Sequence, residues 1–235
     1  MPTTPRAVFL DFYGTLARDV HPTSTIDEVL GERGYTIPDH VRERWWHGDL
    51  DGTEHVDQSR SREHYRAWER ERLLGMLSEA DVHPGEYELI LDELHAGRAD
   101  HSLRAYPEVP DVLRALREGG LLLAVCSNWD WDLEPAVAEA GLTRDVDVLV
   151  SSAWAGARKP HPRIFRYTLE RVDVCPEEVL FVGDTWGPDV EGPRAVGMCA
   201  VYLEREGHWP DPTCPADAAR DVARIVDLRG LLELV

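Results

Sequence analysis

The sequence predicts an α/β protein in which an all-helical module is inserted into a core built on a parallel sheet. Short aliphatic runs recur along the chain without alternating polar residues, as expected of strands buried on both faces. Segments of helical periodicity separate these runs, which indicates repeated βα units. From about residue 17 to residue 100, a charged and aromatic stretch of helical period interrupts this order.

The predicted core begins with a strand over Ala7–Leu10, whose four residues are all apolar. Parallel strands of an open sheet end at the same edge, where ligands bind, so the residues that follow each strand are expected to gather there. Four later runs of the same kind are predicted as strands: Leu121–Cys126, Val148–Ser151, Val179–Val182 and Ala200–Leu203.

The inserted module, predicted over residues 17–100, is expected to contain four helices. The first, Thr25–Gly34, opens with a threonine cap and an acidic first turn and ends at glycine. The longest helix, predicted over Gln58–Glu79, alternates arginine with glutamate, as on an exposed face, and carries an apolar stripe that begins at Tyr65. The remaining two helices are predicted over Pro38–Trp46 and Glu86–His95.

Residues 1–16 and 101–235 are assigned to the core. Its helices are predicted between the strands, and glycine follows three of them, as is common at helix ends. These predicted helices are Pro107–Glu118, Leu133–Ala140, Pro162–Val172 and Asp189–Val196.

The 235 residues carry a formal net charge of −19, which disfavours nucleic acids and anionic membranes as partners. No run approaches the roughly 20 apolar residues that span a bilayer, and no signal peptide is recognised at the N-terminus. Cys126 and Cys199 lie in or beside apolar runs and are expected to be buried thiols, which suits a reducing compartment. A soluble, cytoplasmic protein is therefore expected.

Lys159 is the only lysine among 25 basic residues, and the other 24 are arginine. An ammonium group is a compact point charge, whereas a guanidinium imposes a planar fork on its partner. A single lysine in this background indicates a position that needs the compact charge. An anionic substrate in a protein of this net charge would also need a local cation.

Polar residues follow three of the predicted strands. Asp11 follows the first, Ser127 the second and Asp184 the fourth, and Asp189 comes shortly after. Carboxylates about 4 Å apart repel by about 4 kcal/mol at an effective dielectric constant of about 20, so such a cluster attracts a cation. An all-oxygen set without cysteine or histidine suits magnesium. The group also suits an aspartate that attacks phosphorus, with Lys159 beside it.

Four motifs, taken together, resemble the haloacid dehalogenase superfamily, over about residues 6–16 and 101–205. The resemblance implies a Rossmann-like core, and the helical insertion is similar to the superfamily's C1 cap. The motifs are Asp11-Phe12-Tyr13-Gly14-Thr15, Ser127-Asn128, Lys159-Pro160 and Gly183-Asp184-Thr185 with Asp189.

The resemblance implies a role for each motif. Asp11 would be the nucleophile, and Lys159 would stabilise both Asp11 and the charge on the transferred group. The expected activity is Mg²⁺-dependent hydrolysis of a small phosphorylated metabolite through an aspartyl-phosphate, and no oligomeric state is predicted. The implied contacts to substrate and phosphate are Thr15, Ser127, Asn128 and Lys159, and the implied metal ligands are Asp11, Tyr13 (through its carbonyl oxygen), Asp184 and Asp189.

Tyr13 departs from the phosphatase pattern, which has a second aspartate as the general acid and base at this position. A positioned acid or base contributes roughly 10²–10⁴ in rate. A phenol with a pKa near 10 can donate a proton but is a poor base at neutral pH. Slow turnover of alkyl phosphates, or a preference for acidic leaving groups, is therefore expected.

Two alternatives remain open from the sequence. Tyr13 is also similar to the metal-independent 2-haloacid dehalogenases of the superfamily, in which an arginine such as Arg42 would help to hold the halide. Those enzymes replace the first acid of the last motif, whereas this chain keeps Asp184. The second alternative is a non-catalytic protein that binds a phosphorylated ligand. Asn128 could instead brace its loop. Aromatic residues more often pack than bind a substrate, and Trp129 and Trp186 are the best candidates among them for lining a substrate pocket.

Overall fold

The computed structural model describes residues 4–20, 25–42, 44–45, 50–99, 102–205, 214–215 and 222–235. At its centre is a six-stranded sheet in the order β5-β4-β1-β6-β7-β8, and every neighbouring pair is parallel. The strands are β1 (Ala7–Leu10), β4 (Leu122–Ser127), β5 (Val148–Ser151), β6 (Val179–Gly183), β7 (Cys199–Leu203) and β8 (Ala223–Ile225). This confirms the predicted α/β class and its Rossmann-like core.

β1 lies between β4 and β6 and is the most completely buried strand of the sheet. All four of its residues have no exposed surface. Ala7 pairs with Leu122 of β4 on one side and with Val179 of β6 on the other. The residues that follow β1, β4 and β6 therefore meet at one edge of the sheet.

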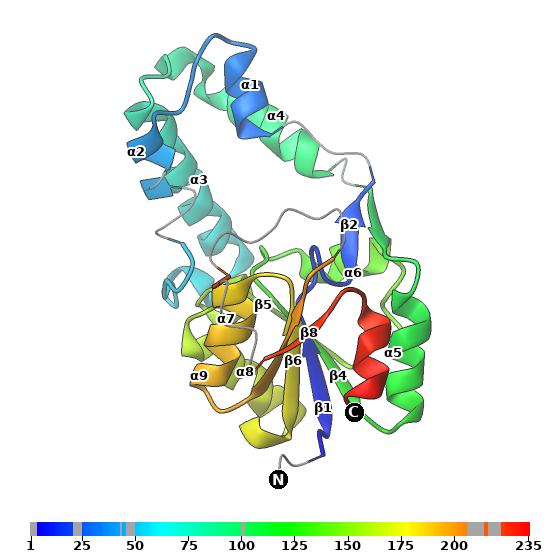
Figure 1. Cartoon of the computed structure of the whole chain (residues 1–235). Helices are drawn as coiled ribbons and strands as arrows, with labels where there is room; N and C mark the ends of the chain where they lie inside the picture. The colour runs from blue at the N-terminus through cyan, green and yellow to red at the C-terminus, as the bar shows by residue number, and fades with distance from the viewer. Residues whose placement is uncertain are drawn as a thin grey trace.

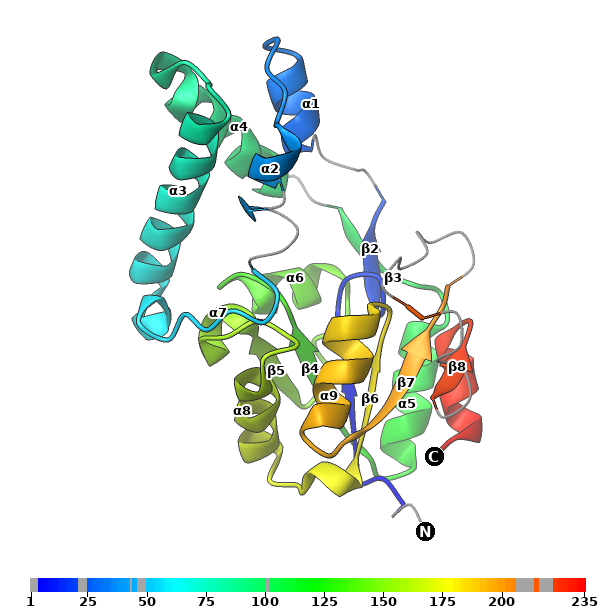
Figure 2. The ribbon, with the colours of Figure 1, turned by 60° about the vertical axis from the view of Figure 1, so that its left-hand side comes forward.

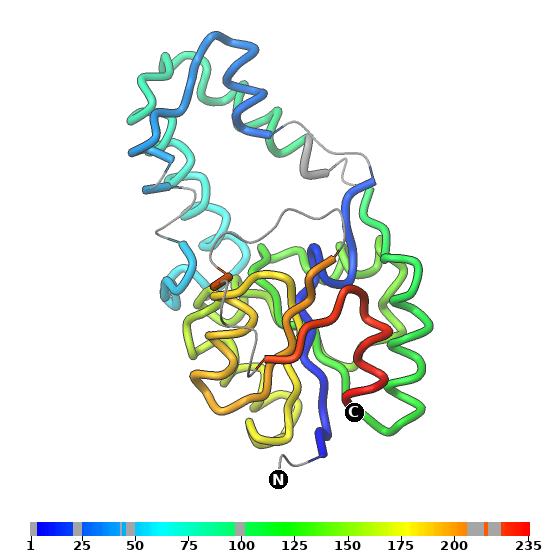
Figure 3. The backbone as a smooth tube through the Cα atoms, viewed as in Figure 1, coloured from blue at the N-terminus to red at the C-terminus, as the bar shows by residue number. Residues whose placement is uncertain are grey.

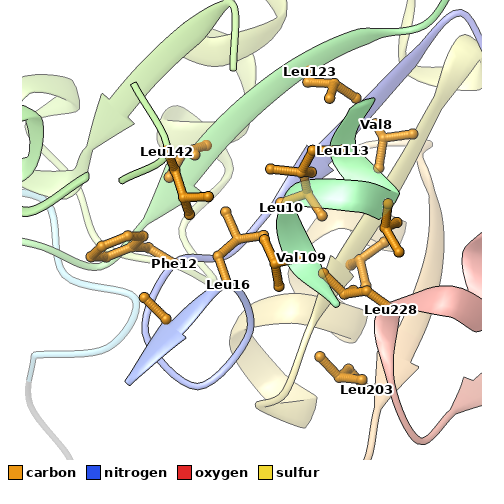
Figure 4. Packing of buried hydrophobic residues seen from close by; sticks show 14 of the residues in the cluster. Val8, Leu10, Phe12, Leu16, Val109, Leu113, Leu123, Leu142, Leu203 and Leu228 are labelled. Atoms are coloured by element: carbon orange, nitrogen blue, oxygen red, sulfur yellow. The ribbon is translucent and has the colours of Figure 1, made fainter. Parts of the chain in front are cut away.

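Helices cover both faces of the sheet (Figures 1 and 2). Val8 and Leu10 pack on one face against α5 (Val109–Glu118) and α6 (Leu133–Glu139), and Figure 4 shows part of this cluster. Ala7 and Phe9 pack on the other face against α8 (Pro162–Val172). Burial on both faces explains why the strands are continuous apolar runs rather than alternating ones. α7 (Ser152–Ala155) and α9 (Gly192–Ala195) complete the described core helices.

A helical module lies beyond the carboxyl ends of the strands (Figures 1 and 2). It contains α1 (Ile26–Gly31), α2 (Asp39–Arg42), α3 (Arg62–Glu79) and α4 (Tyr87–Ala99), and has an apolar cluster of its own. Thr25 caps α1 in a reciprocal capping box with Glu28, as the threonine cap predicts. The module is thus held together by its own core rather than by the sheet.

Two short strands connect the helical module to the sheet and were not predicted. β2 (Ala17–Asp19) precedes the module and β3 (Leu103–Ala105) follows it, and they pair antiparallel with Ala17 opposite Ala105. The backbone trace in Figure 3 shows the two strands side by side at the junction. Each strand is only three residues long, and its partner is distant in the chain, so no local pattern marks it.

Several helices differ from the predicted ranges. The long helix predicted from Gln58 is interrupted, because Ser61 is extended and caps α3 through its hydroxyl. α2 spans Asp39–Arg42, and Arg44 and Trp45 within the predicted range are also helical, whereas Glu43 and Trp46 lie outside the described residues. The helix predicted over Asp189–Val196 consists of a π-helical turn, Gly187–Glu191, followed by α9.

Of the two cysteines expected to be buried, Cys126 is buried but Cys199 is exposed. Cys199 is the first residue of β7, where the strand has not yet entered the core, so the adjoining apolar run did not predict its environment. β8 was also missed, because it is a three-residue edge strand with Arg224 at its centre. Within the described ranges, no helix combines the length and apolarity needed to cross a membrane.

Candidate active site

Asp11 follows β1 at the carboxyl edge of the sheet and is almost completely buried. Its Oδ1 atom accepts two hydrogen bonds, from Ser127 Oγ at 2.8 Å and from Lys159 Nζ at 2.7 Å. Ser127 is the last residue of β4, the strand beside β1, so the parallel pairing brings the two residues together. Both bonds involve Oδ1, which leaves Oδ2 as the oxygen that can act as a nucleophile.

Lys159 is 1% exposed and lies between two carboxylates. Its Nζ atom donates to Asp11 Oδ1 and, at 2.5 Å, to Asp189 Oδ1. Burial alone would lower the pKa of Lys159, but the two carboxylates outweigh burial and raise that pKa above its ordinary value. The only lysine of the chain is therefore a buried, charged group at the site, as its rarity suggested.

Asp11, Asp184 and Asp189 form one acidic cluster in which the nearest carboxylate oxygens all lie within 4.8 Å of one another. Burial raises the pKa of Asp189 to about 7, with Lys159 lowering it and the other two acids raising it. Burial also raises the pKa of Asp11, against the attraction of Lys159. Three carboxylates and one ammonium group leave an excess of negative charge that a divalent cation would neutralise.

The donor set fits magnesium, which prefers oxygen ligands. Two glycines let the backbone approach the carboxylates closely. A Cβ atom on Gly14 would lie 2.1 Å from Asp184 Oδ2, and one on Gly183 would lie 2.3 Å from Asp189 Oδ2. Gly14 also has φ +86°, a conformation that favours glycine. This turn carries the peptide after Tyr13 against Asp184, next to the carbonyl oxygen expected to bind the metal.

Thr15 and Asn128 contact other parts of the site rather than open space. Thr15 is fully buried, and its hydroxyl donates to Asp184 Oδ1 at 3.4 Å. The Asn128 amide donates to the Lys159 carbonyl oxygen at 3.0 Å, and its Oδ1 accepts from the Lys159 N–H at 2.7 Å. Asn128 thus braces the lysine loop, the alternative that the sequence left open. Of the predicted phosphate contacts, Ser127 and Lys159 bond Asp11 directly.

Tyr13 lies at the mouth of the site with 44% of its surface exposed. Its ring centre is 6.3 Å from that of Trp129. Burial of the rest of the side chain and then the Asp19 carboxylate raise the pKa of Tyr13 above its ordinary value. The phenol is therefore protonated at neutral pH and does not act as a base there.

A cavity of about 420 Å³ lies between the helical module and the core. It is lined by Tyr65 and Glu69 from α3, by Trp129 and Asp130 after β4, and by Arg158. An adjacent cavity of about 310 Å³ shares Tyr65, Glu69 and Arg158 with it. The three residues after Ser127 therefore line one side of a cleft, and α3 lines the other side.

Of the two tryptophan candidates for the pocket, Trp129 lines it and Trp186 does not. Trp186 is buried and packs edge-on against Tyr202, with ring centres 5.5 Å apart. Trp129 packs edge-on against Phe12, with ring centres 5.3 Å apart. Both tryptophans follow a motif directly, so only the direction of the chain after each strand separates them.

Arg42 does not take the position of a halide-binding residue. Its guanidinium forms two hydrogen bonds with the Asp27 carboxylate, at 2.5 and 2.8 Å. Both residues belong to the helical module, and α2 lies far from the end of β1 in Figures 1 and 2. The spacing of Arg42 along the chain was therefore misleading.

Arg205 was missed by the sequence analysis, although it contacts the loop that carries the nucleophile. Its Nε donates to the Gly14 carbonyl oxygen at 3.1 Å, and its Nη2 to that of Thr15 at 2.7 Å. Arg205 stands in a charged stretch after β7 that looks like an ordinary solvated loop. No local signal distinguishes it from the other arginines of the chain.

Comparison with known proteins adds a family and several relatives. The family model for haloacid dehalogenase-like hydrolases matches residues 5–197. A phosphoserine phosphatase from Thermus thermophilus is 37% identical over 125 residues, which cover 53% of this chain and 48% of that protein. An (S)-2-haloacid dehalogenase from Pseudomonas sp. is 35% identical over 109 residues, covering 46% of this chain and 47% of that protein. The chain thus spans about half the length of these curated relatives.

A solved structure, described as a predicted phosphoglycolate phosphatase from Haemophilus somnus, is similar along nearly its whole length. It is 18% identical with a TM-score of 0.70, and the match covers 99% of this chain and 98% of that chain. At this identity the likeness supports the fold. The relatives include both phosphatases and dehalogenases, and so leave the choice between the two reactions open.

Proposed function

The chain belongs to the haloacid dehalogenase-like hydrolases, and we propose that within this family it is a Mg²⁺-dependent phosphatase that forms an aspartyl-phosphate on Asp11. The observation that carries the proposal is the acidic cluster. Asp184 and Asp189 stand beside Asp11, and Lys159 is the one ammonium group that touches the cluster in the described part of the chain. An active site for carbon–halogen cleavage would hold this excess negative charge against an anionic haloacid without a metal.

In the proposed reaction, Asp11 Oδ2 attacks phosphorus while Oδ1 stays bonded to Ser127 and Lys159. The bond between phosphorus and the leaving oxygen breaks, and a proton reaches that oxygen either from water or from Tyr13, which then recovers a proton from the attacking water of the next step. Water then attacks phosphorus, which releases phosphate and restores the carboxylate. Lys159 balances the charge of Asp11 and of the phosphoryl group. The metal, when bound by Asp11, Asp184, Asp189 and the Tyr13 carbonyl, would orient the phosphate and neutralise its charge.

The helical module is proposed to act as a C1-type cap, with residues 17–100 as the cap and residues 1–16 and 101–235 as the core. The cleft between α3 and the loop after β4 supports this division, because Tyr65 of the module and Trp129 of the core line the same cavity. The leaving group of a small phosphorylated metabolite would occupy this cleft. Closure of such a cap excludes water during phosphoryl transfer.

Metal-independent dehalogenation is the second candidate. It is favoured by Tyr13 and by the similarity to an (S)-2-haloacid dehalogenase. In that reaction Asp11 would attack carbon and displace halide. The retained acids oppose it, and so does Arg42, because this arginine is paired with Asp27 inside the helical module.

A panel of phosphate esters and 2-chloropropionate, assayed with Mg²⁺ and with EDTA, tests the two candidates together. Phosphate release that requires Mg²⁺ and stops in EDTA is expected, with no chloride release. Chloride release that persists in EDTA would instead establish the dehalogenase. Mass-spectrometric trapping of phosphorylated Asp11 would separate a phosphatase from a protein that only binds phosphorylated ligands.

A further inference from the structure

We propose that Arg205 is a positioning residue that holds the metal-binding loop after the nucleophile in place, a role that rests on the proposed Mg²⁺-dependent function. Arg205 lies two residues after Leu203, the last residue of β7. Its guanidinium bonds two consecutive carbonyl oxygens, those of Gly14 and Thr15, at 3.1 and 2.7 Å. These are the residues that follow Tyr13, whose own carbonyl oxygen is the proposed backbone ligand.

The geometry of the contact requires a guanidinium. Its N–H groups form a rigid planar fork, so two carbonyl groups that bind it must point to the same side of the loop. At Gly14 the backbone has φ +86° and passes so close to Asp184 that a Cβ atom would lie 2.1 Å from Oδ2. Because the guanidinium fixes the carbonyl groups of Gly14 and Thr15, it also fixes the separation between this turn and the Asp184 carboxylate.

The guanidinium is itself oriented by buried groups. Its Nη1 donates to Glu108 Oε1 at 2.7 Å, and Arg205 and Glu108 are only 9% and 6% exposed. The Tyr106 ring lies against it, with 3.7 Å from the guanidinium carbon to the ring centre. Desolvating two charges offsets most of their attraction, and apolar packing would often be as stable. A buried pair aimed at loop carbonyl groups is thus better explained by placement than by stability.

The same group of residues joins the metal-binding loop to the helical module. Tyr106 and Glu108 follow β3, the strand that returns from the module. The Tyr106 N–H donates to the Leu16 carbonyl oxygen at 3.0 Å, so this connection is tied to the nucleophile loop at a second point. Arg205 consequently bridges three segments that are distant in sequence: the end of β7, the loop after β1 and the connection after β3.

Two variants of Arg205 test the proposal in the full chain. R205K keeps the charge beside Glu108 but removes the fork, and R205A creates a space that free guanidinium ion can fill. Calorimetric titration with MgCl₂ measures metal binding directly, and steady-state kinetics separate kcat from KM. R6M is the matched control, because Arg6 forms an exposed pair with Glu178 away from the site.

R205K is expected to weaken Mg²⁺ binding about tenfold and to lower kcat with little change in KM for the ester. Millimolar guanidinium is expected to restore part of the Mg²⁺ affinity of R205A, and R6M to match the unaltered protein. If R205A fails to fold by circular dichroism, R205K decides the question. Unaltered Mg²⁺ affinity in R205K would overturn this role alone, whereas no Mg²⁺ binding by the unaltered protein would overturn the proposed function and this role with it.

Discussion

At the scale of single residues, the two oxygens of Asp11 have different surroundings. Oδ1 accepts from Ser127 and Lys159, and Oδ2 takes part in neither bond. The same carboxylate can therefore be held in place and remain reactive. Lys159 holds Asp11 through Oδ1 alone, and its compact ammonium group can bond both Asp11 and Asp189 while almost completely buried.

Asp11→Asn is expected to lower kcat by on the order of 10³-fold or more, because an amide is not a nucleophile toward phosphorus. The amide oxygen can still accept from Ser127 and Lys159, so the fold is expected to survive. Phosphate release from an aryl phosphate measures the loss, and a thermal melt checks the fold. Activity within tenfold of the unaltered protein would show that Asp11 is not the nucleophile.

Tyr13→Asp is expected to raise kcat on alkyl phosphates by roughly 10–100-fold, since a positioned carboxyl group can both protonate the leaving oxygen and activate water. Rates on aryl phosphates, whose leaving groups need no proton, are expected to change little. Tyr13→Phe, which only removes the hydroxyl, is the control. A rate on alkyl esters that does not rise in Tyr13→Asp would mean that another group already performs the proton transfer.

At the scale of elements, the turn after β1 determines whether the acids can meet. Gly14 combines a positive φ with a close approach to Asp184, whereas Gly141, after α6, has φ +81° but no atom of the described residues within 4 Å of an added Cβ. The two glycines share a backbone conformation and differ in their surroundings. Comparing them separates backbone strain from disruption of the site.

Gly14→Ala and Gly141→Ala are each expected to cost about 1–3 kcal/mol in the free energy of unfolding, from the left-handed backbone conformation. Only Gly14→Ala is expected to weaken Mg²⁺ binding and activity as well, because its Cβ would displace the Asp184 carboxylate. Denaturant unfolding and magnesium titration measure the two effects. Equal Mg²⁺ affinity in both variants would argue against a metal site at Asp184.

At the scale of the whole molecule, the helical module and the core meet around His55. Its backbone N–H donates to the Gly156 carbonyl oxygen of the core, and its ring stacks on Trp68 of α3 at 5.0 Å. Its Nε2 atom is buried and has no hydrogen-bond partner among the described residues. Burial first, and then the nearby charges of Arg158 and Arg72, lower the pKa of His55 to about 4.

The stability of the protein is therefore expected to fall as the pH drops from about 6.5 toward 4. In that range the unfolded chain binds a proton at this residue and the folded protein does not, so folding loses at most about 3 kcal/mol through His55. Above about pH 7 His55 is neutral in both the folded and the unfolded chain, so this loss of stability is absent. Urea unfolding of His55→Gln should show a shallower pH dependence than the unaltered protein, and the exposed His95→Gln should show none of this change.

The amino-acid sequence was sufficient to predict the elements whose cause is local. Strands buried on both faces had to be continuous apolar runs, so five of the six core strands could be found, and α8 was predicted to the residue. It also determined which polar residues stand at strand ends, and parallel pairing brings Asp11, Ser127 and Asp184 to one edge. The rarity of lysine singled out Lys159 before any contact was known.

The contacts that those residues make are visible only in the folded protein. Thr15 lies against Asp184, Asn128 braces the lysine loop, and the β2–β3 pair joins the module to the sheet. Arg205 became part of the site through contacts with the loop after β1. The physical reason is common to all four. Short polar contacts between segments distant in the chain leave no periodic pattern, whereas burial of a whole face does.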